Sequence, residues 1–123
     1  MLGSAALVAF VPTTDLGRAQ DFYGGILGLA VTEVNDFACV LAGGGMTLRV
    51  TKVGELRPQP FTVLGWAVTD IRATLAALTA AGVEPLVFDG MGQDSAGVWT
   101  APGGAQIVWF HDPDQNVLSL TQF

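Results

Sequence analysis

The chain is poor in charge, in basic residues, in histidine and in cysteine. Only 13% of its 123 residues are charged, with 5 Lys and Arg against 11 Asp and Glu, and it has 1 His. The single cysteine, Cys39, excludes an internal disulfide bond. The net charge of −6 and the scattered basic residues leave no electrostatic footprint for nucleic acid, and an anionic membrane surface would repel the chain. We therefore expect neither partner.

Long apolar runs are also lacking. No stretch approaches the roughly 18 apolar residues that a membrane-spanning helix needs. The apolar start has no basic residue before it and runs into a Pro-Thr-Thr-Asp turn, which favours a first strand over a signal peptide. We therefore expect a cytoplasmic protein. Hydrophobic residues nevertheless make up 50% of the chain. This composition fits one domain with a large core, and the sparse surface charge favours a homodimer.

An internal repeat organises the sequence. A β-type run meets a Thr-Asp-aliphatic step twice, at residues 14–16 and 69–71, and a helical pattern follows each time. The Thr and Asp side chains are N-cap candidates, because they accept hydrogen bonds from the free N–H groups of a first helical turn. The spacing of the apolar residues predicts helices over 15–27 and 70–81.

Three β-type runs follow each helix. Gly28 and Gly82 stand where a helix end needs a left-handed residue. Turn formers separate the runs, and residues 54–60, with two prolines, read as a linker. The predicted strands are Ala30–Val34, Phe37–Leu41 and Met46–Lys52 in the first half, and Glu84–Phe88, Gly97–Ala101 with Gln106–Phe110, and Asn116–Thr121 in the second.

Each half is thus a β-α-β-β-β unit. Because one half could not bury its sheet alone, we expect a single α+β domain over 1–123, with modules 1–53 and 61–123. The loop from Asp89 to Gly97 occurs only in the second half. It is either a mobile lid or an ordinary surface loop.

Motifs at both ends of the chain resemble one family. The run from Phe10 to Leu16, with Asp-Phe-Tyr at 21–23 and Leu-Gly-Leu at 27–29, is similar to the opening of the vicinal oxygen chelate superfamily, and residues 109–120 resemble its closing hairpin. That superfamily holds glyoxalases, extradiol dioxygenases, fosfomycin-resistance enzymes and bleomycin-binding proteins. The resemblance covers nearly the whole chain. It implies tandem βαβββ modules, each a curved sheet with its helix on the convex side, and a cavity between the concave faces.

The resemblance also implies where a divalent metal would bind. Catalytic members hold the ion with His and Glu or Gln on the concave face, at positions that are Val8, Arg49, Val63 and Ser119 here. Valine cannot ligate, arginine repels a cation, and a lone serine is a poor ligand. We therefore expect neither a bound metal nor another cofactor, and we assign no catalytic residue.

Strand alternation and the positions of the aromatic residues give the candidate ligand-binding residues, with the face of Phe37, Trp99 and Trp109 left open. If Leu118 and Leu120 pack beneath the helix, the residues that alternate with them face the cavity. Aromatic walls suit a flat or apolar ligand, although core packing explains each aromatic residue equally well. The candidate set is Val8, Phe10, Phe37, Thr47, Arg49, Val63, Gly65, Trp99, Trp109, Ser119 and Thr121.

Three other residues have two interpretations each. His111 is either a general base or a solvated residue at a strand end. Cys39 is either reactive or a small packed core residue. Gln115 stands where the family usually has glycine, so either it adopts a left-handed backbone or the turn differs.

Together these features predict a metal-independent protein that sequesters a small, partly aromatic molecule in the cavity between its sheets. The alternative is a glyoxalase-like enzyme, either a lyase or isomerase that uses Arg49, Ser119 or His111, or a dioxygenase with unusual ligands. A third interpretation is a partner-binding module whose pocket is filled by its own side chains.

Overall fold

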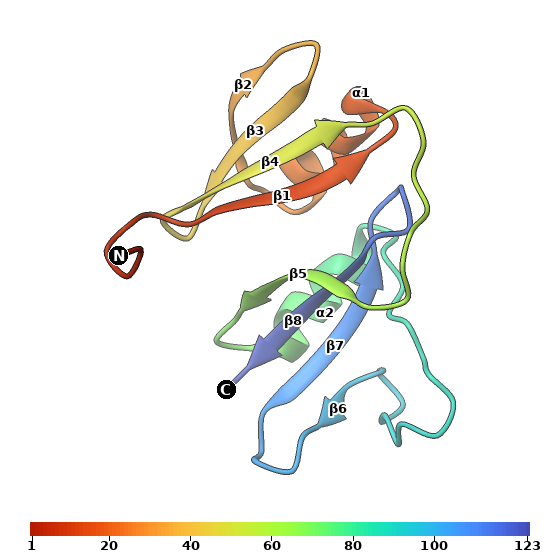
Figure 1. Cartoon of the computed structure of the whole chain (residues 1–123). Coiled ribbons are helices and arrows are strands. Elements are labelled where there is room, and N and C mark those ends of the chain that lie inside the picture. The colour runs from red at the N-terminus through yellow and green to blue at the C-terminus, as the bar shows by residue number, and fades with distance from the viewer. The chain divides into compact units, whose positions relative to one another are not determined.

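The computed structural model describes all residues from 1 to 123, and the chain divides into two compact units, 1–57 and 58–123. The boundary falls within the proline-containing segment 54–60. Each unit holds a four-stranded mixed sheet with helical structure on one face (Figure 1). The order of elements in each unit is β-α-β-β-β, which confirms the predicted α+β class and its tandem modules. None of the helices combines the length and apolar character that a membrane crossing requires.

In the first unit the strand order is β1-β4-β3-β2, with β1 parallel to β4 and the other pairs antiparallel. The helix begins at Asp15, whose carboxylate accepts the N–H of Arg18 at 3.0 Å. The predicted helix over 15–27 is found, but its second half is wound as a π-helix. The elements are β1 (Val8–Thr13), α1 (Leu16–Gln20), η1 (Asp21–Ile26), β2 (Ala30–Val34), β3 (Ala38–Gly43) and β4 (Met46–Lys52).

In the second unit the strand order is β5-β8-β7-β6, with β5 parallel to β8. The helix begins at Asp70, whose carboxylate accepts the N–H of Ala73 at 3.0 Å. Gly28 and Gly82 both have a positive φ, +77° and +88°, as predicted for helix ends. The elements are β5 (Thr62–Ala67), α2 (Ile71–Ala80), β6 (Trp99–Thr100), β7 (Gln106–His111) and β8 (Val117–Gln122).

Alternate side chains of each sheet form the core beneath its helix. In the first unit the buried strand residues include Leu48 and Val50, and in the second Leu118 and Leu120. The helices contribute apolar side chains to these cores, among them Tyr23 in the first unit and Ile71, Leu75 and Leu78 in the second. The side chains of opposite parity therefore define a second, helix-free face of each sheet.

One predicted strand is wrong. The segment Glu84–Phe88 makes a single bridge, from Pro85 to Phe110, and one further bond from the N–H of Leu86 to the carbonyl of Trp109 at 2.8 Å. Pro85 has no N–H to donate to a ladder. The N–H of Phe88 and the carbonyl of Leu86 are bonded instead to the side chain of Gln93. Local side-chain bonds thus replace the expected strand pairing.

Candidate functional site: the helix-free faces of the two sheets

The helix-free face of the first unit gathers four of the predicted residues. Val8 lies opposite Thr47, and Phe10 lies opposite Arg49, on the parallel strands β1 and β4. Phe10 is 64% exposed, and the guanidinium of Arg49 makes no hydrogen bond or ion pair. This face therefore combines an exposed aromatic ring with an available cation.

Phe37 and Thr51 of the first unit differ from these four residues in position and environment. Phe37 lies in the turn before β3 and is 75% exposed, so it does not join the rows that Phe10 and Arg49 form. Thr51 shares the parity of Arg49, and its hydroxyl is buried without a hydrogen-bond partner. Such a hydroxyl costs about 1–3 kcal/mol unless water or a ligand satisfies it.

The helix-free face of the second unit gathers five more. One cross-strand row runs from Gly65 through Ser119 to Trp109. The next row contains Thr121 and Trp99, with Ile107 between them. The two tryptophans are therefore neighbours on one face.

Phe88, Trp99 and Trp109 form a cluster, which we call the aromatic platform. The ring centroids of Phe88 and Trp109 lie 5.6 Å apart at 83°, and those of Trp99 and Trp109 lie 6.0 Å apart at 38°. The indole N–H of Trp109 donates to Thr62 Oγ1 at 3.0 Å, which fixes the ring on the sheet. The remaining tryptophan, Trp66, stacks on Phe110 at 6.4 Å among the residues of core parity. The platform is thus a separate aromatic surface.

A bulge in β5 explains why Thr62 reaches Trp109. The register shifts between Thr62 and Leu64, so Val63 is the extra residue and pairs with no residue of β8. Val63 is 41% exposed at this bulge. With regular alternation, Thr62 would lie on the helix-covered face of the sheet, and Gly65 on the helix-free face. Sequence reasoning therefore missed Thr62, because nothing in the local residue pattern marks the bulge.

Gly65 allows a close approach between β5 and β8. A Cβ at this position would lie 2.5 Å from Ser119 Oγ and 3.4 Å from the backbone oxygen of Ser119. The serine hydroxyl thus occupies the space that a side chain at 65 would fill. The row beside Trp109 thus consists of two small residues, Gly65 and Ser119, and the serine is only 9% exposed. This part of the face is therefore low and flat.

The residues at the expected metal positions do not fit a divalent ion. Val8 and Val63 have no donor atom, Arg49 is a cation, and Ser119 offers one neutral hydroxyl. The structure contains no group of three or more His, Cys, Asp or Glu side chains that could hold a metal ion. We derive no metal-dependent step for this chain.

Cys39, His111 and Gln115, for which the sequence allows two interpretations each, lie in different environments. Cys39 is fully buried, and burial raises the pKa of its thiol, which supports the packed-core interpretation. His111 ends β7 and is half-buried. Gln115 has a φ of +69° and is the one non-glycine residue in the left-handed region. That conformation is supported by Asp112, whose carboxylate accepts the N–H groups of Asp114 and Asn116 at 2.9 Å each.

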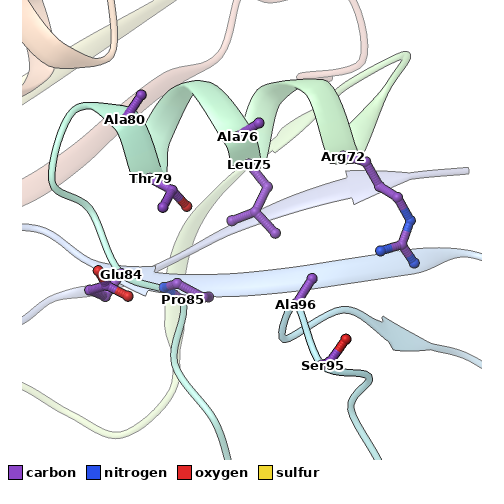
Figure 2. Close-up of a pocket in the computed structure, with 9 residues that line it drawn as sticks. All are labelled: Arg72, Leu75, Ala76, Thr79, Ala80, Glu84, Pro85, Ser95 and Ala96. Carbon is purple, nitrogen blue, oxygen red and sulfur yellow. The ribbon is translucent and has the colours of Figure 1, made fainter.

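A groove of about 590 Å³ lies on the helix side of the second unit. Figure 2 shows it between α2 and the turn at Ser95 and Ala96, with Arg72 and Glu84 at opposite ends. Its helical wall is lined mostly by small side chains such as Ala76 and Ala80. It is therefore distinct from the aromatic platform, which lies on the other face.

Comparisons with known proteins agree with this geometry. A member of the glyoxalase/bleomycin resistance protein/dioxygenase superfamily from Sphaerobacter thermophilus matches with a TM-score of 0.76 and 19% identity, over 100% of both chains. TioX from a Micromonospora species matches with a TM-score of 0.74 and 18% identity, over 97% of this chain and 98% of that one. Lactoylglutathione lyase from Agrobacterium tumefaciens matches with a TM-score of 0.74 and 14% identity, over 97% and 93%. These likenesses establish the fold.

The search of curated proteins gave no match. The sequence model of the Glyoxalase/Bleomycin resistance protein/Dioxygenase superfamily, however, matches residues 5–120. This match covers nearly the whole chain and includes both of the motifs that first indicated the resemblance. The protein therefore belongs to the Glyoxalase/Bleomycin resistance protein/Dioxygenase superfamily.

Proposed function

We propose that this protein binds a small, planar and partly aromatic molecule, without a metal ion and without changing the molecule chemically. The aromatic platform carries the proposal. Trp109 is held between Phe88 and Trp99, and its only polar group is bonded to Thr62. Rings that are already fixed lose little conformational freedom when a flat ligand packs on them.

The surroundings of the platform support the same class of ligand. Gly65 and Ser119 beside Trp109 leave a low surface against which a planar group fits. Apolar and aromatic lining with few polar groups is typical of small-molecule sites. The residues at the expected metal positions are not suited to hold an ion that would polarise a substrate, which favours binding over a metal-dependent reaction.

Calorimetric titration in a metal-chelating buffer tests this proposal. The probes are bleomycin, which the superfamily is named for, and ethidium, a planar aromatic cation. We expect at least one probe to bind the wild-type protein and Trp109→Leu to weaken that binding about tenfold, or ~1.4 kcal/mol. Trp66→Leu is the matched control, because Trp66 has core parity, and it should leave the affinity unchanged.

The recovered probe is then analysed by mass spectrometry. An unchanged mass and unchanged fragments agree with sequestration. Conversion of the probe, or binding that requires added metal, would contradict the proposal and favour an enzyme. Equal loss of affinity in Trp109→Leu and Trp66→Leu would show that the platform is not the binding surface.

A further inference from the structure

The two outer rings of the aromatic platform stand at opposite ends of one loop, and we propose that Gln93 is the positioning residue that holds them in place. Phe88 precedes the loop and Trp99 follows it, on β6, while Trp109 between them belongs to β7. The importance of this residue for ligand affinity rests on the proposed function. The effect of Gln93 on the positions of the three rings does not depend on that function, because all the contacts involved lie within the second unit.

The side chain of Gln93 bonds to both ends of the loop. Its Oε1 accepts the N–H of Phe88 at 2.8 Å. Its Nε2 donates to the carbonyls of Leu86 and Gly97, each at 2.8 Å. Leu86 in turn donates its N–H to the carbonyl of Trp109 at 2.8 Å. One amide therefore joins the chain before the loop, the chain after it and, through Leu86, the central strand of the platform.

Only an amide of this length satisfies the three groups together. Glutamate keeps the acceptor but loses both donors, so a carboxylate oxygen would face two carbonyl oxygens. Methionine has a similar volume and reach but no strong donor or acceptor. Either replacement leaves the N–H of Phe88 or the carbonyls of Leu86 and Gly97 without their partner in the structure.

The neighbouring residue orders the rest of the loop. Asp94 Oδ1 accepts the N–H groups of Ala96 and Val98, and Asp94 Oδ2 forms an ion pair with Arg72 of α2 at 2.7 Å. Beside this ion pair the groove separates the loop from the small side chains of α2 (Figure 2). Hydrogen bonds of the Gln93 and Asp94 side chains, together with backbone bonds within the loop, therefore hold the loop in place more than apolar packing against the helix does.

The consequence concerns ligand selection. Because Phe88 and Trp99 both contact Trp109, their positions set the outline of the surface that a planar ligand meets. Without Gln93 the two ends of the loop lose the side-chain bonds that join them, and Trp99 would be held against Trp109 by the short pairing of β6 with β7. The core beneath α2 would remain, since neither Gln93 nor the loop tip belongs to it.

The experiment measures the platform directly. The indole rings of Trp99 and Trp109 lie close together and are not parallel, so their transitions couple and give an exciton pair in the circular dichroism spectrum. Trp99→Phe defines the spectrum without this coupling. We expect Gln93→Glu and Gln93→Met to reduce the coupled signal by at least half and to weaken binding of the wild-type probe, bleomycin or ethidium, about tenfold.

Gln106→Glu is the matched control. It adds the same charge to the same unit, at the start of β7 and with the parity of the core residue Val108. It should change neither the exciton signal nor the affinity. The cooperative urea transition is measured for every variant, and we expect Gln93→Met to retain it.

Each outcome decides between the claims. An unchanged exciton signal in both Gln93 variants would overturn the positioning role, as would loss of the cooperative transition in both, which would assign Gln93 to global stability. If the signal falls but the wild-type protein binds neither probe, the positioning role stands and the proposed function fails. If a probe binds the wild-type protein, and both Gln93 variants keep the wild-type exciton signal and affinity, the proposed function stands and the role of Gln93 fails.

Discussion

Gly65 and Ser119 show how one absent side chain shapes the helix-free face of the second unit. The two residues lie opposite each other on β5 and β8. A Cβ at 65 would meet the hydroxyl of Ser119 at 2.5 Å, which is closer than non-bonded atoms allow. The backbone oxygen of Ser119, at 3.4 Å, would be in ordinary van der Waals contact, so the hydroxyl is the atom that must move. Glycine at 65 leaves the space that this hydroxyl fills.

We predict that Gly65→Ala destabilises the protein by about 1–3 kcal/mol through overpacking. Gly54→Ala is the control, because a Cβ there meets nothing within 4 Å, and its effect should stay within about 0.5 kcal/mol. The double variant Gly65→Ala/Ser119→Ala should recover part of the loss, as measured by urea unfolding. Strict additivity of the two single changes would show that the hydroxyl is not the obstacle.

Cys39 illustrates a residue whose chemistry is suppressed by its environment. It is fully buried in β3, opposite Val50 of β4, and burial raises the pKa of its thiol. The thiolate is the reactive form, and a raised pKa lowers its population at neutral pH. We predict that iodoacetamide labels the native protein only at the rate of unfolding, while labelling in urea is fast. Rapid labelling of the native protein would contradict this assignment.

Among the elements, regular strands were predictable and irregular ones were not. Alternation along β4 and β8 correctly separates Leu48 and Leu118 from Arg49 and Ser119, because a side chain points to the opposite face at each step. The bulge at Val63 depends on β8, which is distant in sequence, so no local pattern contains it. The loss of the strand at Glu84–Phe88 has local causes, Pro85 and the hydrogen bonds of Gln93, but the apolar run alone does not show that this side chain competes with strand pairing.

The loop between α2 and β6 gives a prediction on pH. The hydrogen bond from Arg72, together with those from Val98 and Ala96, lowers the pKa of Asp94 below that of an unfolded aspartate, about 3.9. A lowered folded-state pKa gives stability that is complete above the unfolded value and is lost as the pH falls through the folded value.

The stability difference between wild type and Asp94→Asn should therefore shrink as the pH falls from about 6 to about 2. Urea midpoints of both proteins across this range measure it. The difference should be small throughout, because both partners are exposed, 53% for Arg72 and 39% for Asp94. A difference that grows on acidification would contradict the assigned direction. Arg72→Met should reproduce the behaviour of Asp94→Asn.

For the whole molecule, the repeat and the end motifs were sufficient to predict the fold. Two Thr-Asp steps gave both helix starts, and the capping carboxylates of Asp15 and Asp70 confirm them. The candidate site was predictable only in part. The sequence named Trp99 and Trp109 as candidate wall residues but left the face of each open. Phe88 joins them through a ring contact, and Thr62 and Gln93 support the platform through hydrogen bonds, which arise only on folding.

The homodimer stays a prediction. Several large apolar side chains are exposed, including Leu7, Phe10, Phe37 and Phe61. Exposed apolar surface of this kind favours association. Sedimentation velocity should give a mass of about twice 12.8 kDa at micromolar concentration. A single species at the monomer mass would contradict this expectation.

The most direct test of the binding surface is a titration followed by the indole N–H resonances of the three tryptophans. Bleomycin and ethidium are added separately to isotopically labelled protein in a metal-chelating buffer. Our account predicts that at least one probe shifts the resonances of Trp99 and Trp109 in a saturable manner, while Trp66 changes little. A shift confined to Trp66, or no saturable shift of Trp99 and Trp109 with either probe, would contradict it.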